Sequence, residues 1–261
     1  ISYAESRLRD CVTSPATTVM VTAASANTVE VATDSADTAA GTPIEGADGS
    51  SGPAAPVTDQ FGNPVSGENV DVSVNGPFES GTTSQQTGDD GIGTFTDLVI
   101  TEAGNYTLTF ETANDSNETA SFEVTPAQVD TVELTSAPSS VDAGGSATFS
   151  AEALDKFDNV ITSADTEFTW TVTNGGGEVN DGEYSAPTST GMATIQAGYN
   201  SETNSSSITI EPAPVDSVTI EPDTAQEVEP GETLEFSANA TDEFGNEITT
   251  DASQFSWNNT D

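Results

Sequence analysis

The chain has 261 residues, with 44 acidic and three basic side chains and no histidine, so its formal net charge at pH 7 is -41. This charge excludes nucleic acids and anionic membranes as direct partners, because no basic surface is available to meet phosphate groups. With one cysteine, one lysine and no histidine, the usual general bases and partners of nucleophiles are missing. We therefore predict that the protein is not an enzyme.

The acidic residues are scattered through apolar alternations, and 11 Phe, four Tyr and two Trp are available for cores. A disordered acidic tail would instead gather its charge in blocks and lack aromatic residues. Repulsion on this scale would destabilise a compact state in dilute buffer. In molar salt the Debye length falls to about 3 Å, which screens the repulsion. The composition therefore predicts a folded protein of a halophile, and we infer a haloarchaeal source.

The first 27 residues differ from the rest of the chain. The opening ISYAESRLRD contains both arginines and has the composition of a short helix. It is either a linking segment or a stalk helix that continues from an apolar anchor upstream of Ile1, and the sequence leaves both alternatives open. Cys11 has no partner cysteine within the chain, so it is either a spare thiol or a link to another chain.

A short motif, Asp-x-Phe-(Gly or Asp)-Asn, occurs three times, as DQFGN from Asp59, DKFDN from Asp155 and DEFGN from Asp242. Each copy follows a similar opening, namely TVEVATDS, TVELTSAP or SVTIEPDT. Internal repetition of this kind indicates a fold unit that is used several times. An active-site loop, by contrast, normally occurs once. The motif is therefore predicted to be a structural corner of a repeated domain.

Apolar residues alternate with polar ones on both sides of each motif, which predicts half-buried β-strands. Each complete copy holds about seven such strands, separated by Gly, Asn, Asp and Ser turns, as in a two-sheet sandwich of immunoglobulin type. The predicted core residues are Val72, Val74, Tyr106, Leu108, Phe110, Phe122 and Val124 in the first copy, Phe149, Ala151, Ala153, Phe168, Trp170, Val172, Ala193, Ile195, Ala197, Ile208 and Ile210 in the second, and Phe236, Ala238, Ala240, Phe255 and Trp257 in the third.

The predicted fold class is all-β, with tandem immunoglobulin-like (Ig-like) Greek-key β-sandwiches after a short N-terminal segment that could be helical. We predict this segment at residues 1–27, Ig-like repeats at 28–126 and 127–212, and an incomplete third repeat at 213–261. The first repeat is longer than the second, and we place its insert in Gly46–Pro56.

The corner residues are those that tight turns require. Asp and Asn side chains hydrogen-bond the backbone two residues on, and Gly, Asp and Asn tolerate the left-handed conformation. We predict that the Phe between them covers the end of the core. The predicted structural turn residues are Asp59, Asn63, Asp155, Asn159, Asp242 and Asn246.

In the first copy the corner reads DQFGNPV, and TGDDGIGTFTDLVITEAGNYTLTF follows it. These two stretches resemble the bacterial Ig-like repeats of invasin and intimin type, which carry a D-x-x-G-N-P-V corner and a late A-G-x-Y-x-L/V strand. The second copy departs from that pattern, because Asp158 replaces the Gly and its GEYSAPTSTGMATIQA resembles related repeats with a G-x-Y-x-A-P signature. The resemblance implies the sandwich fold and an extracellular, cell-surface setting, but a shared fold does not transfer a ligand.

The third repeat holds only about half of a sandwich and would expose an apolar face and a strand edge. The sequence leaves two explanations open: the chain is part of a longer protein, or a strand from a neighbouring subunit completes the fold.

Two kinds of modification or ligand site are predicted from local sequence. No cofactor is expected, but calcium could use the oxygen ligands of DKFDN and TGDDG. The candidate calcium ligands are Asp155, Asp158, Asp89 and Asp90, although Asp and Asn are also ordinary turn residues. The N-x-S/T sequons, which accept N-linked glycans in exported proteins, are at Asn105, Asn114, Asn117, Asn204, Asn239 and Asn258.

The sequence therefore predicts a non-enzymatic extracellular protein of a halophile whose Ig-like repeats form a stalk, filament or adhesive surface appendage. The expected partners are other copies of the chain, or surface proteins and glycans. Two alternatives stay open. One is a self-assembling pilus or surface-layer subunit completed by strand donation, and the other is a virion spike or tail attachment protein of a halophilic virus.

Overall fold

The computed structural model describes residues 22–162, 167–248 and 254–258. The predicted N-terminal helix and Cys11 lie outside these described residues. Every named element within them is a β-strand, and the fold is that of tandem Ig-like sandwiches, as predicted. The chain divides into two compact units. Unit 1 contains Pro43–Leu98 and Tyr106–Phe122 with the residues up to Ala36, and unit 2 contains Asp37–Thr42, Val99–Asn105 and Glu123–Asp261.

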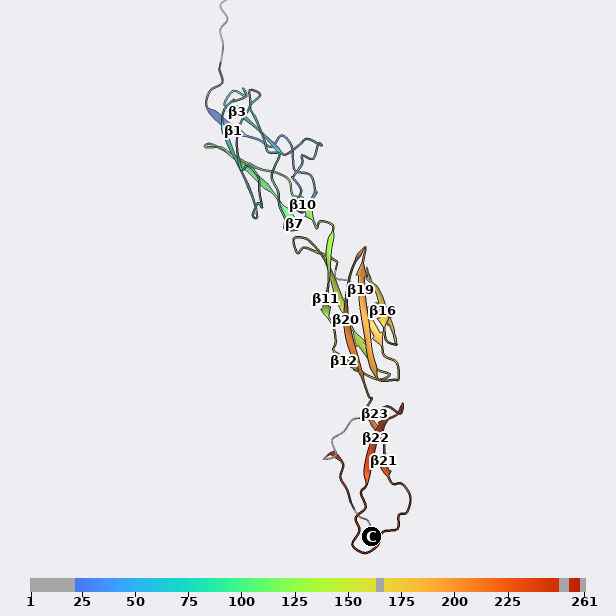
Figure 1. Ribbon diagram of the computed structural model, residues 1–261. Helices are drawn as coiled ribbons and strands as arrows, with labels where there is room; N and C mark the ends of the chain where they lie inside the picture. The colour runs from blue at the N-terminus through green and yellow to red at the C-terminus, as the bar shows by residue number, and fades with distance from the viewer. Residues whose placement is uncertain (1–21, 163–166, 249–253, 259–261) are drawn as a thin grey trace, which may run out of the picture. The chain divides into compact units, whose positions relative to one another are not determined.

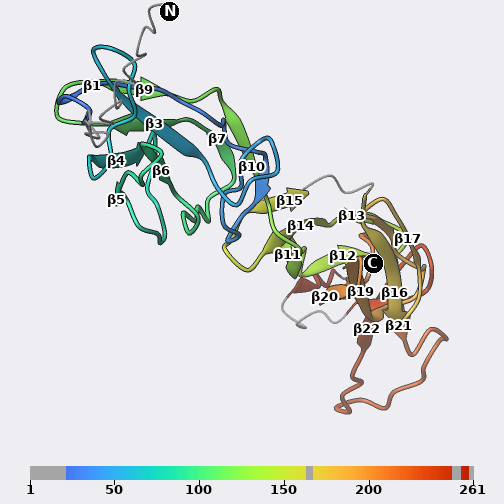
Figure 2. The same cartoon turned by 90° about the horizontal axis from the view of Figure 1, so that it is seen from above.

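Unit 1 is built around two sheets, which Figure 2 shows through the labels β1, β3 and β6 and the labels β4, β5 and β9. The three-stranded sheet has the order β1-β3-β6 and the four-stranded sheet the order β5-β4-β8-β9. All the pairings in these sheets are antiparallel. The strands are β1 (Ala26–Val29), β3 (Ala54–Asp59), β4 (Asn69–Val74), β5 (Ser84–Gln86), β6 (Ile92–Thr94), β8 (Leu108–Glu111) and β9 (Ser116–Glu118).

The core of unit 1 comes from the inward faces of these strands and from the loops between them. The Phe95 and Phe110 rings lie 5.5 Å apart, within the range of favourable aromatic pairs. The insert was predicted to extend to Pro56, but Ala54, Ala55 and Pro56 belong to β3. The fully buried apolar side chains include Val29, Ile44, Ala55, Val57, Val70, Phe95, Leu98, Leu108 and Phe110.

Unit 2 contains the second sandwich and the sheet of the third repeat. The second sandwich pairs the sheet β11-β14-β15 with the sheet β12-β20-β19-β16, and a small sheet β13-β18-β17 closes one side; β19, β20, β16 and β12 are labelled in Figure 1. Its strands are β11 (Val129–Ser136), β12 (Ser140–Asp142), β13 (Ser146–Thr148), β14 (Ser150–Asp155), β15 (Val160–Thr162), β16 (Thr169–Asn174), β17 (Glu178–Asn180), β18 (Glu183–Ser185), β19 (Gly191–Tyr199) and β20 (Glu202–Glu211).

One contiguous core fills this sandwich. Ala193, Ile195 and Ala197 of β19 are buried, as the alternation in ATIQA predicts. The Phe149 and Trp170 rings lie 6.4 Å apart across the core, and the Tyr184 hydroxyl donates to the carbonyl of Gly176 at 2.6 Å. The buried cluster consists of Val132, Ala143, Phe149, Ala151, Ala153, Phe168, Trp170, Tyr184, Ala193, Ile195, Ala197, Ile208 and Ile210.

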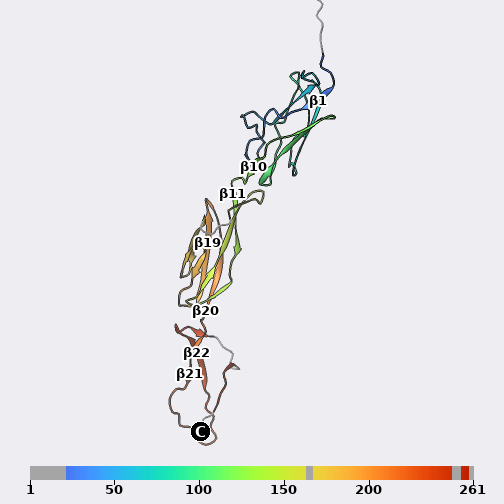
Figure 3. The same cartoon turned by 180° about the vertical axis from the view of Figure 1, so that it is seen from behind.

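Two further sheets belong wholly or partly to unit 2. The sheet β2-β10-β7 contains β2 (Thr38–Ala39), β10 (Phe122–Thr125) and β7 (Gly104–Tyr106), with β2 and β10 parallel. The sheet β21-β22-β23 contains β21 (Val215–Glu221), β22 (Ser237–Asp242) and β23 (Glu247–Ile248), and β21 lies beside β22 in Figures 1 and 3. Among the described residues, no helix has the length and apolar character needed to cross a membrane.

The third repeat departs from the predicted core. Ala240 is buried, but Phe236 is 51% exposed and Trp257 is 50% exposed. The physical reason is that no second sheet covers β21 and β22 among the described residues. The alternation in this repeat therefore sets which face is apolar without burying it.

Candidate functional site

The most regular polar feature of the molecule is the Asp corner, defined as residues 59–63, 155–159 and 242–246. Each corner follows the strand that ends in its aspartate, namely β3, β14 or β22. In the second corner the N–H of Asp155 donates to the carbonyl of Asn159 at 3.0 Å. The fourth residue is left-handed in each copy, with φ of 82° at Gly62, 65° at Asp158 and 85° at Gly245, which explains why only Gly or Asp occurs there.

The aspartate carboxylate accepts four hydrogen bonds, shown here for the second corner. Its Oδ1 accepts the backbone N–H of Phe157 at 2.8 Å and that of Asn159 at 3.0 Å. Its Oδ2 accepts Nδ2 of Asn159 at 2.8 Å and the backbone N–H of Ala127 at 2.7 Å. The matching donors are Phe61, Asn63 and Ala24 for Asp59, and Phe244, Asn246 and Ala213 for Asp242.

The alanine donors give the corner a second role. Ala24, Ala127 and Ala213 each lie two residues before the first strand of a repeat, which is β1, β11 or β21. They are 35, 28 and 29 residues from their aspartates along the chain. One carboxylate therefore closes its own loop and also holds the segment by which the chain enters the repeat.

Hydrogen bonds keep the pKa of all three corner carboxyls below the ordinary value for aspartate. For Asp59 the largest cause is the side-chain amide of Asn63. For Asp155 and Asp242 burial is the largest single effect and would raise the pKa, but the donated hydrogen bonds together outweigh it. The three carboxylates are thus ionised at neutral pH and fully engaged with donors. They are poorly suited to accept a proton from a substrate.

The phenylalanine of the corner points away from the core that it was predicted to cover. Phe61 is 75% and Phe244 is 42% exposed, and Phe157 is only half-buried. Within unit 2, the Phe157 ring lies so close to Gly41 that a Cβ at that glycine would overlap it. Phe244 lies against Gly144 in the same way, with its Cζ 2.9 Å from the position of a Cβ. The ring therefore packs against a glycine of the preceding repeat sequence.

The asparagine of the corner makes a second contact beside the ring. Asn159 donates from Nδ2 to the carbonyl of Thr101 at 2.7 Å and accepts the N–H of Ala103 on Oδ1 at 2.8 Å.

Asn246 repeats this arrangement in the third corner. It donates to the carbonyl of Thr188 at 2.8 Å and accepts the N–H of Thr190 at 3.3 Å. The phenylalanine ring and the asparagine amide of a corner therefore contact the same neighbouring surface, and we call these two side chains the plug.

The surface that receives the plug is also repeated, and we call it the socket. It consists of the glycine turn, residues 39–42 or 142–145, and the loop beside it, residues 100–103 or 187–190. The two parts are joined by a backbone hydrogen bond, from Gly41 to the carbonyl of Ile100 at 2.8 Å and from Gly144 to that of Pro187 at 2.9 Å.

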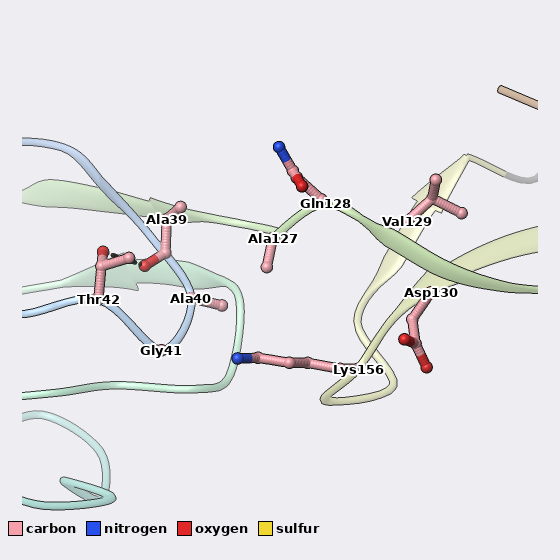
Figure 4. Close-up of a pocket in the computed structure, with 9 residues that line it drawn as sticks. All are labelled: Ala39, Ala40, Gly41, Thr42, Ala127, Gln128, Val129, Asp130 and Lys156. Atoms are coloured by element: carbon pink, nitrogen blue, oxygen red, sulfur yellow. Dashed lines mark hydrogen bonds between the residues drawn. The ribbon is translucent and has the colours of Figure 1, made fainter. Parts of the chain in front are cut away.

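A shallow hollow next to the second corner is lined by residues 39–42, 127–130 and Lys156, all in unit 2 (Figure 4). In Figure 4 the Lys156 side chain extends from its loop towards the turn at Gly41, and its Nζ lies 4.7 Å from the centre of the Phe157 ring. The charged side chains that line the hollow are Lys156 and Asp130.

The calcium candidates do not form a cluster. Both oxygens of Asp155 are occupied by protein donors, so a cation would have to displace them. Asp90 accepts the N–H of Ile92 at 3.0 Å, Asp89 accepts the hydroxyl of Ser66 at 3.4 Å, and Asp158 is exposed. Among the described residues, no group of three or more His, Cys, Asp or Glu side chains is placed to hold a metal ion.

All six sequon asparagines are exposed in the structure. Asn117 and Asn204 occupy equivalent places, because they donate from Nδ2 to the carbonyls of Val29 and Val132, at 3.5 and 2.9 Å. Asn114 likewise donates to the carbonyl of Ala26 at 2.9 Å. These three amides therefore have a structural role in addition to the predicted glycan attachment.

Sequence reasoning missed the alanine donors, the outward phenylalanines and the sockets. A signal for the alanines was present, since Pro126-Ala127 and Pro212-Ala213 stand at the same offset before their repeats. A signal for the sockets was present as well, in the glycine that recurs at 41, 144 and 231.

No protein-family model matches the chain, and no curated protein matches it. Among solved structures the chain is similar to the Escherichia coli adhesin FdeC, with a TM-score of 0.53 and 18% identity over 86% of this chain and 77% of that one. It also matches invasin, described as a bacterial integrin-binding protein, with a TM-score of 0.41 and 20% identity over 85% of this chain and 47% of that one. InvD of Yersinia pseudotuberculosis gives a TM-score of 0.40 and 20% identity, covering 81% and 69%.

This chain thus spans about half the length of invasin. The similarity to FdeC supports the fold assignment alone, and the two lower-scoring matches add no argument to it.

Proposed function

We propose that this chain is a non-enzymatic extracellular protein of a halophile, in which tandem Ig-like repeats form a stalk, filament or adhesive appendage at the cell surface. Its partners are other copies of itself, or surface proteins and glycans. The mechanism is mechanical and steric, because linked repeats hold a binding end away from the cell.

The observation that carries this proposal is the recurrence of the Asp corner. Three carboxylates each hold the segment that enters a repeat, through Ala24, Ala127 or Ala213. A catalytic carboxylate needs a free oxygen near its substrate, whereas these carboxylates are saturated with protein donors. A structural corner that recurs in every repeat is what a spacer built from repeated domains requires. The adhesin fold neighbour supports the adhesive role by analogy only.

The distribution of acidic residues supports the halophilic part of the proposal. Among the described residues, the buried acidic side chains are Asp59, Asp155 and Asp242, which are the three corner residues. The other described acidic residues reach solvent, where molar salt screens their mutual repulsion.

A salt titration tests the halophilic part. Circular dichroism is expected to report a cooperative fold in molar KCl that is lost on dialysis into salt-free buffer. A stable, cooperative fold without salt would contradict a halophilic origin and would leave the spacer role untouched.

Single-molecule stretching tests the spacer role. Pulled from its ends in molar salt, the chain is expected to unfold in separate steps for the first and second repeats. The Asp155→Ala variant is expected to lower the force of the second-repeat step alone. A single step that includes both repeats, or an unchanged force in the variant, would contradict the role given to the corner.

A second candidate function is a self-assembling subunit completed by strand donation. The observation in its favour is the exposed apolar surface of the third repeat, where Val218 and Ile220 of β21 are 52% and 47% exposed and Phe236, the residue before β22, is 51% exposed. Electron microscopy of the purified chain in molar salt is expected to show filaments that disappear in the Phe236→Asp variant. Monomers at all concentrations would remove this candidate.

A further inference from the structure

The second repeat has one sheet face without acidic side chains. It is the outward side of β16, β19 and β20, which are hydrogen-bonded neighbours in one sheet and are labelled in Figure 1. Residues that pair across antiparallel strands lie on the same side of a sheet, so Thr171, Gln196 and Ser205 form one outward row. The face consists of every second residue of β16 from 169 to 173, of β19 from 192 to 198 and of β20 from 203 to 209, and we call it the neutral face. These residues are Thr, Ser, Gln, Met and Gly.

Acidic side chains occupy the outward sides of the comparable sheets. In the four-stranded sheet of unit 1, Asp71 of β4 lies opposite Glu111 of β8. On the other sheet of the second sandwich, Glu133 of β11 lies opposite Glu152 of β14. The neutral face therefore differs both from its counterpart in the first repeat and from the opposite face of its own repeat, in a chain of net charge -41. Depletion of charged residues is the compositional mark of the centre of a protein–protein interface.

The side chains of the neutral face can hydrogen-bond to a copy of themselves. A hydroxyl and a glutamine amide each donate and accept, whereas a carboxylate only accepts. A face of carboxylates has no donors for its own copy and repels it. A contact between identical surfaces of two copies requires a self-complementary surface, and the neutral face meets this requirement.

The neutral face also offers apolar contact area. Met192 is 61% exposed and lies opposite Thr209 on the outward side. Methionine is enriched in interfaces, where its flexible side chain fills irregular gaps. The threonines add methyl groups, and their branched side chains have few rotamers to lose when they are buried.

We propose that two copies of this chain pack through their neutral faces, sheet against sheet, about a two-fold axis. Twisted sheets pack face to face when their strands are inclined by about 30°. At one end of the sheet Asp142 lies opposite Glu211. An axis that runs across the strands places this acidic end over the far end of the partner copy, so the four carboxylates do not meet. The proposal rests on the proposed function for the kind of partner, and it names the surface through which copies bind.

The contact is expected to be weak and to need salt. A polar face buries little apolar area, so the dimer is expected at high protein concentration. At low ionic strength the repulsion between two chains of charge -41 opposes association, and molar salt screens it.

Sedimentation equilibrium in molar KCl tests the proposal, at chain concentrations up to about 1 mM. All proteins carry Cys11→Ser and Phe236→Asp, which remove association through a disulfide and through the apolar surface of the third repeat. This parent chain is expected to show a monomer–dimer equilibrium. Gln196→Glu changes only the charge at the centre of the neutral face and is expected to raise the Kd at least about tenfold, because like charges would face each other.

The matched control is Gln86→Glu, which makes the same change on the outward side of the four-stranded sheet of unit 1, where Gln86 lies opposite Asn69. It is expected to leave the Kd unchanged, and circular dichroism is expected to show that both variants fold.

A parent chain that stays monomeric would overturn the proposal and leave the neutral face to another occupant, such as a different protein or O-linked sugars. An unchanged Kd in Gln196→Glu, or an equal rise in Gln86→Glu, would overturn it as well. None of these results affects the separate unfolding of the repeats under force, which tests the spacer role independently.

Discussion

The strand pairs β11–β14 and β21–β22 have the same register as far as Leu134–Ala151 and Ile220–Ala238, beyond which β11–β14 alone has a further shift, but the two pairs differ in burial. Each antiparallel ladder begins with a valine paired with the corner aspartate, Val129 with Asp155 or Val215 with Asp242. A bulge follows this first pair. Yet Phe149 is fully buried and its counterpart Phe236 is 51% exposed. The comparison teaches that pairing and register follow from the local strand pattern and the corner, whereas burial requires the second sheet.

The largest expected difference between the two pairs is the cost of losing the phenylalanine. Phe149→Ala removes a ring at the centre of a closed core and is expected to lower the free energy of unfolding of the second repeat by about 3–5 kcal/mol. Phe236→Ala is expected to change the free energy of unfolding of the third repeat by less than about 0.5 kcal/mol. Denaturant unfolding in molar salt, followed by the fluorescence of Trp170 in the second repeat and Trp257 in the third, measures both. Equal losses would contradict the role given to the second sheet.

Loss of the corner carboxylate is expected to rank next. Asp155→Ala removes four hydrogen bonds to a buried charge and leaves several backbone donors unpaired. The expected destabilisation of the second repeat is about 3 kcal/mol. Glu152→Ala, on the same strand, is the control and is expected to cost less than about 0.5 kcal/mol. Equal losses of stability in the two variants, measured by the same unfolding experiment, would contradict the stabilising role given to the corner carboxylate.

A smaller effect is expected from a polar contact within the second sandwich. Tyr184→Phe removes the hydroxyl that donates to the carbonyl of Gly176 at 2.6 Å, at an expected cost of about 1 kcal/mol. Tyr199→Phe, at a half-buried position of the same repeat, is the matched control. If Tyr199→Phe lowered the free energy of unfolding as much as Tyr184→Phe, the hydrogen bond from Tyr184 to Gly176 would not be the cause of the loss.

The smallest expected effect separates the second corner from the other two. Asp158 is left-handed where the first and third corners have Gly62 and Gly245. Asp158→Gly is expected to raise the free energy of unfolding by about 0.5 kcal/mol, and with it the midpoint temperature, because relief of the left-handed conformation exceeds the added freedom of the unfolded chain. A lower midpoint in thermal unfolding would indicate that the Asp158 side chain makes a stabilising contact.

Much of the fold was predictable because strand alternation is a local signal. The buried faces of β14, β16, β19 and β20 follow directly from the spacing of residues such as Ala151, Trp170 and Ile195. The corner positions were predictable from repetition of the Asp and Asn residues. These features depend on residues near one another in sequence.

The parts that could not be predicted depend on distant residues. Whether Phe157 packs inward or outward is decided by a glycine turn more than a hundred residues earlier in the chain, at Gly41. The fourth hydrogen bond of Asp155 comes from Ala127, 28 residues away. The exposure of Phe236 depends on a sheet that the described residues lack, which no pattern within β22 can reveal.

The most direct test of the claim that the Asp155 carboxylate holds the segment entering its repeat is a pH titration of the Ala127 backbone amide by NMR in molar salt. The pKa of Asp155 is lowered in the folded state, so the unfolded chain takes up this proton first. The associated stability is present above about pH 4, the ordinary pKa of aspartate, and is lost as the pH falls through the folded value. The Ala127 amide is expected to hold its chemical shift as the pH falls through about 4, the ordinary pKa of aspartate, and to move only at lower pH. An Ala127 amide that already moves at about pH 4 would contradict the role given to the corner carboxylate.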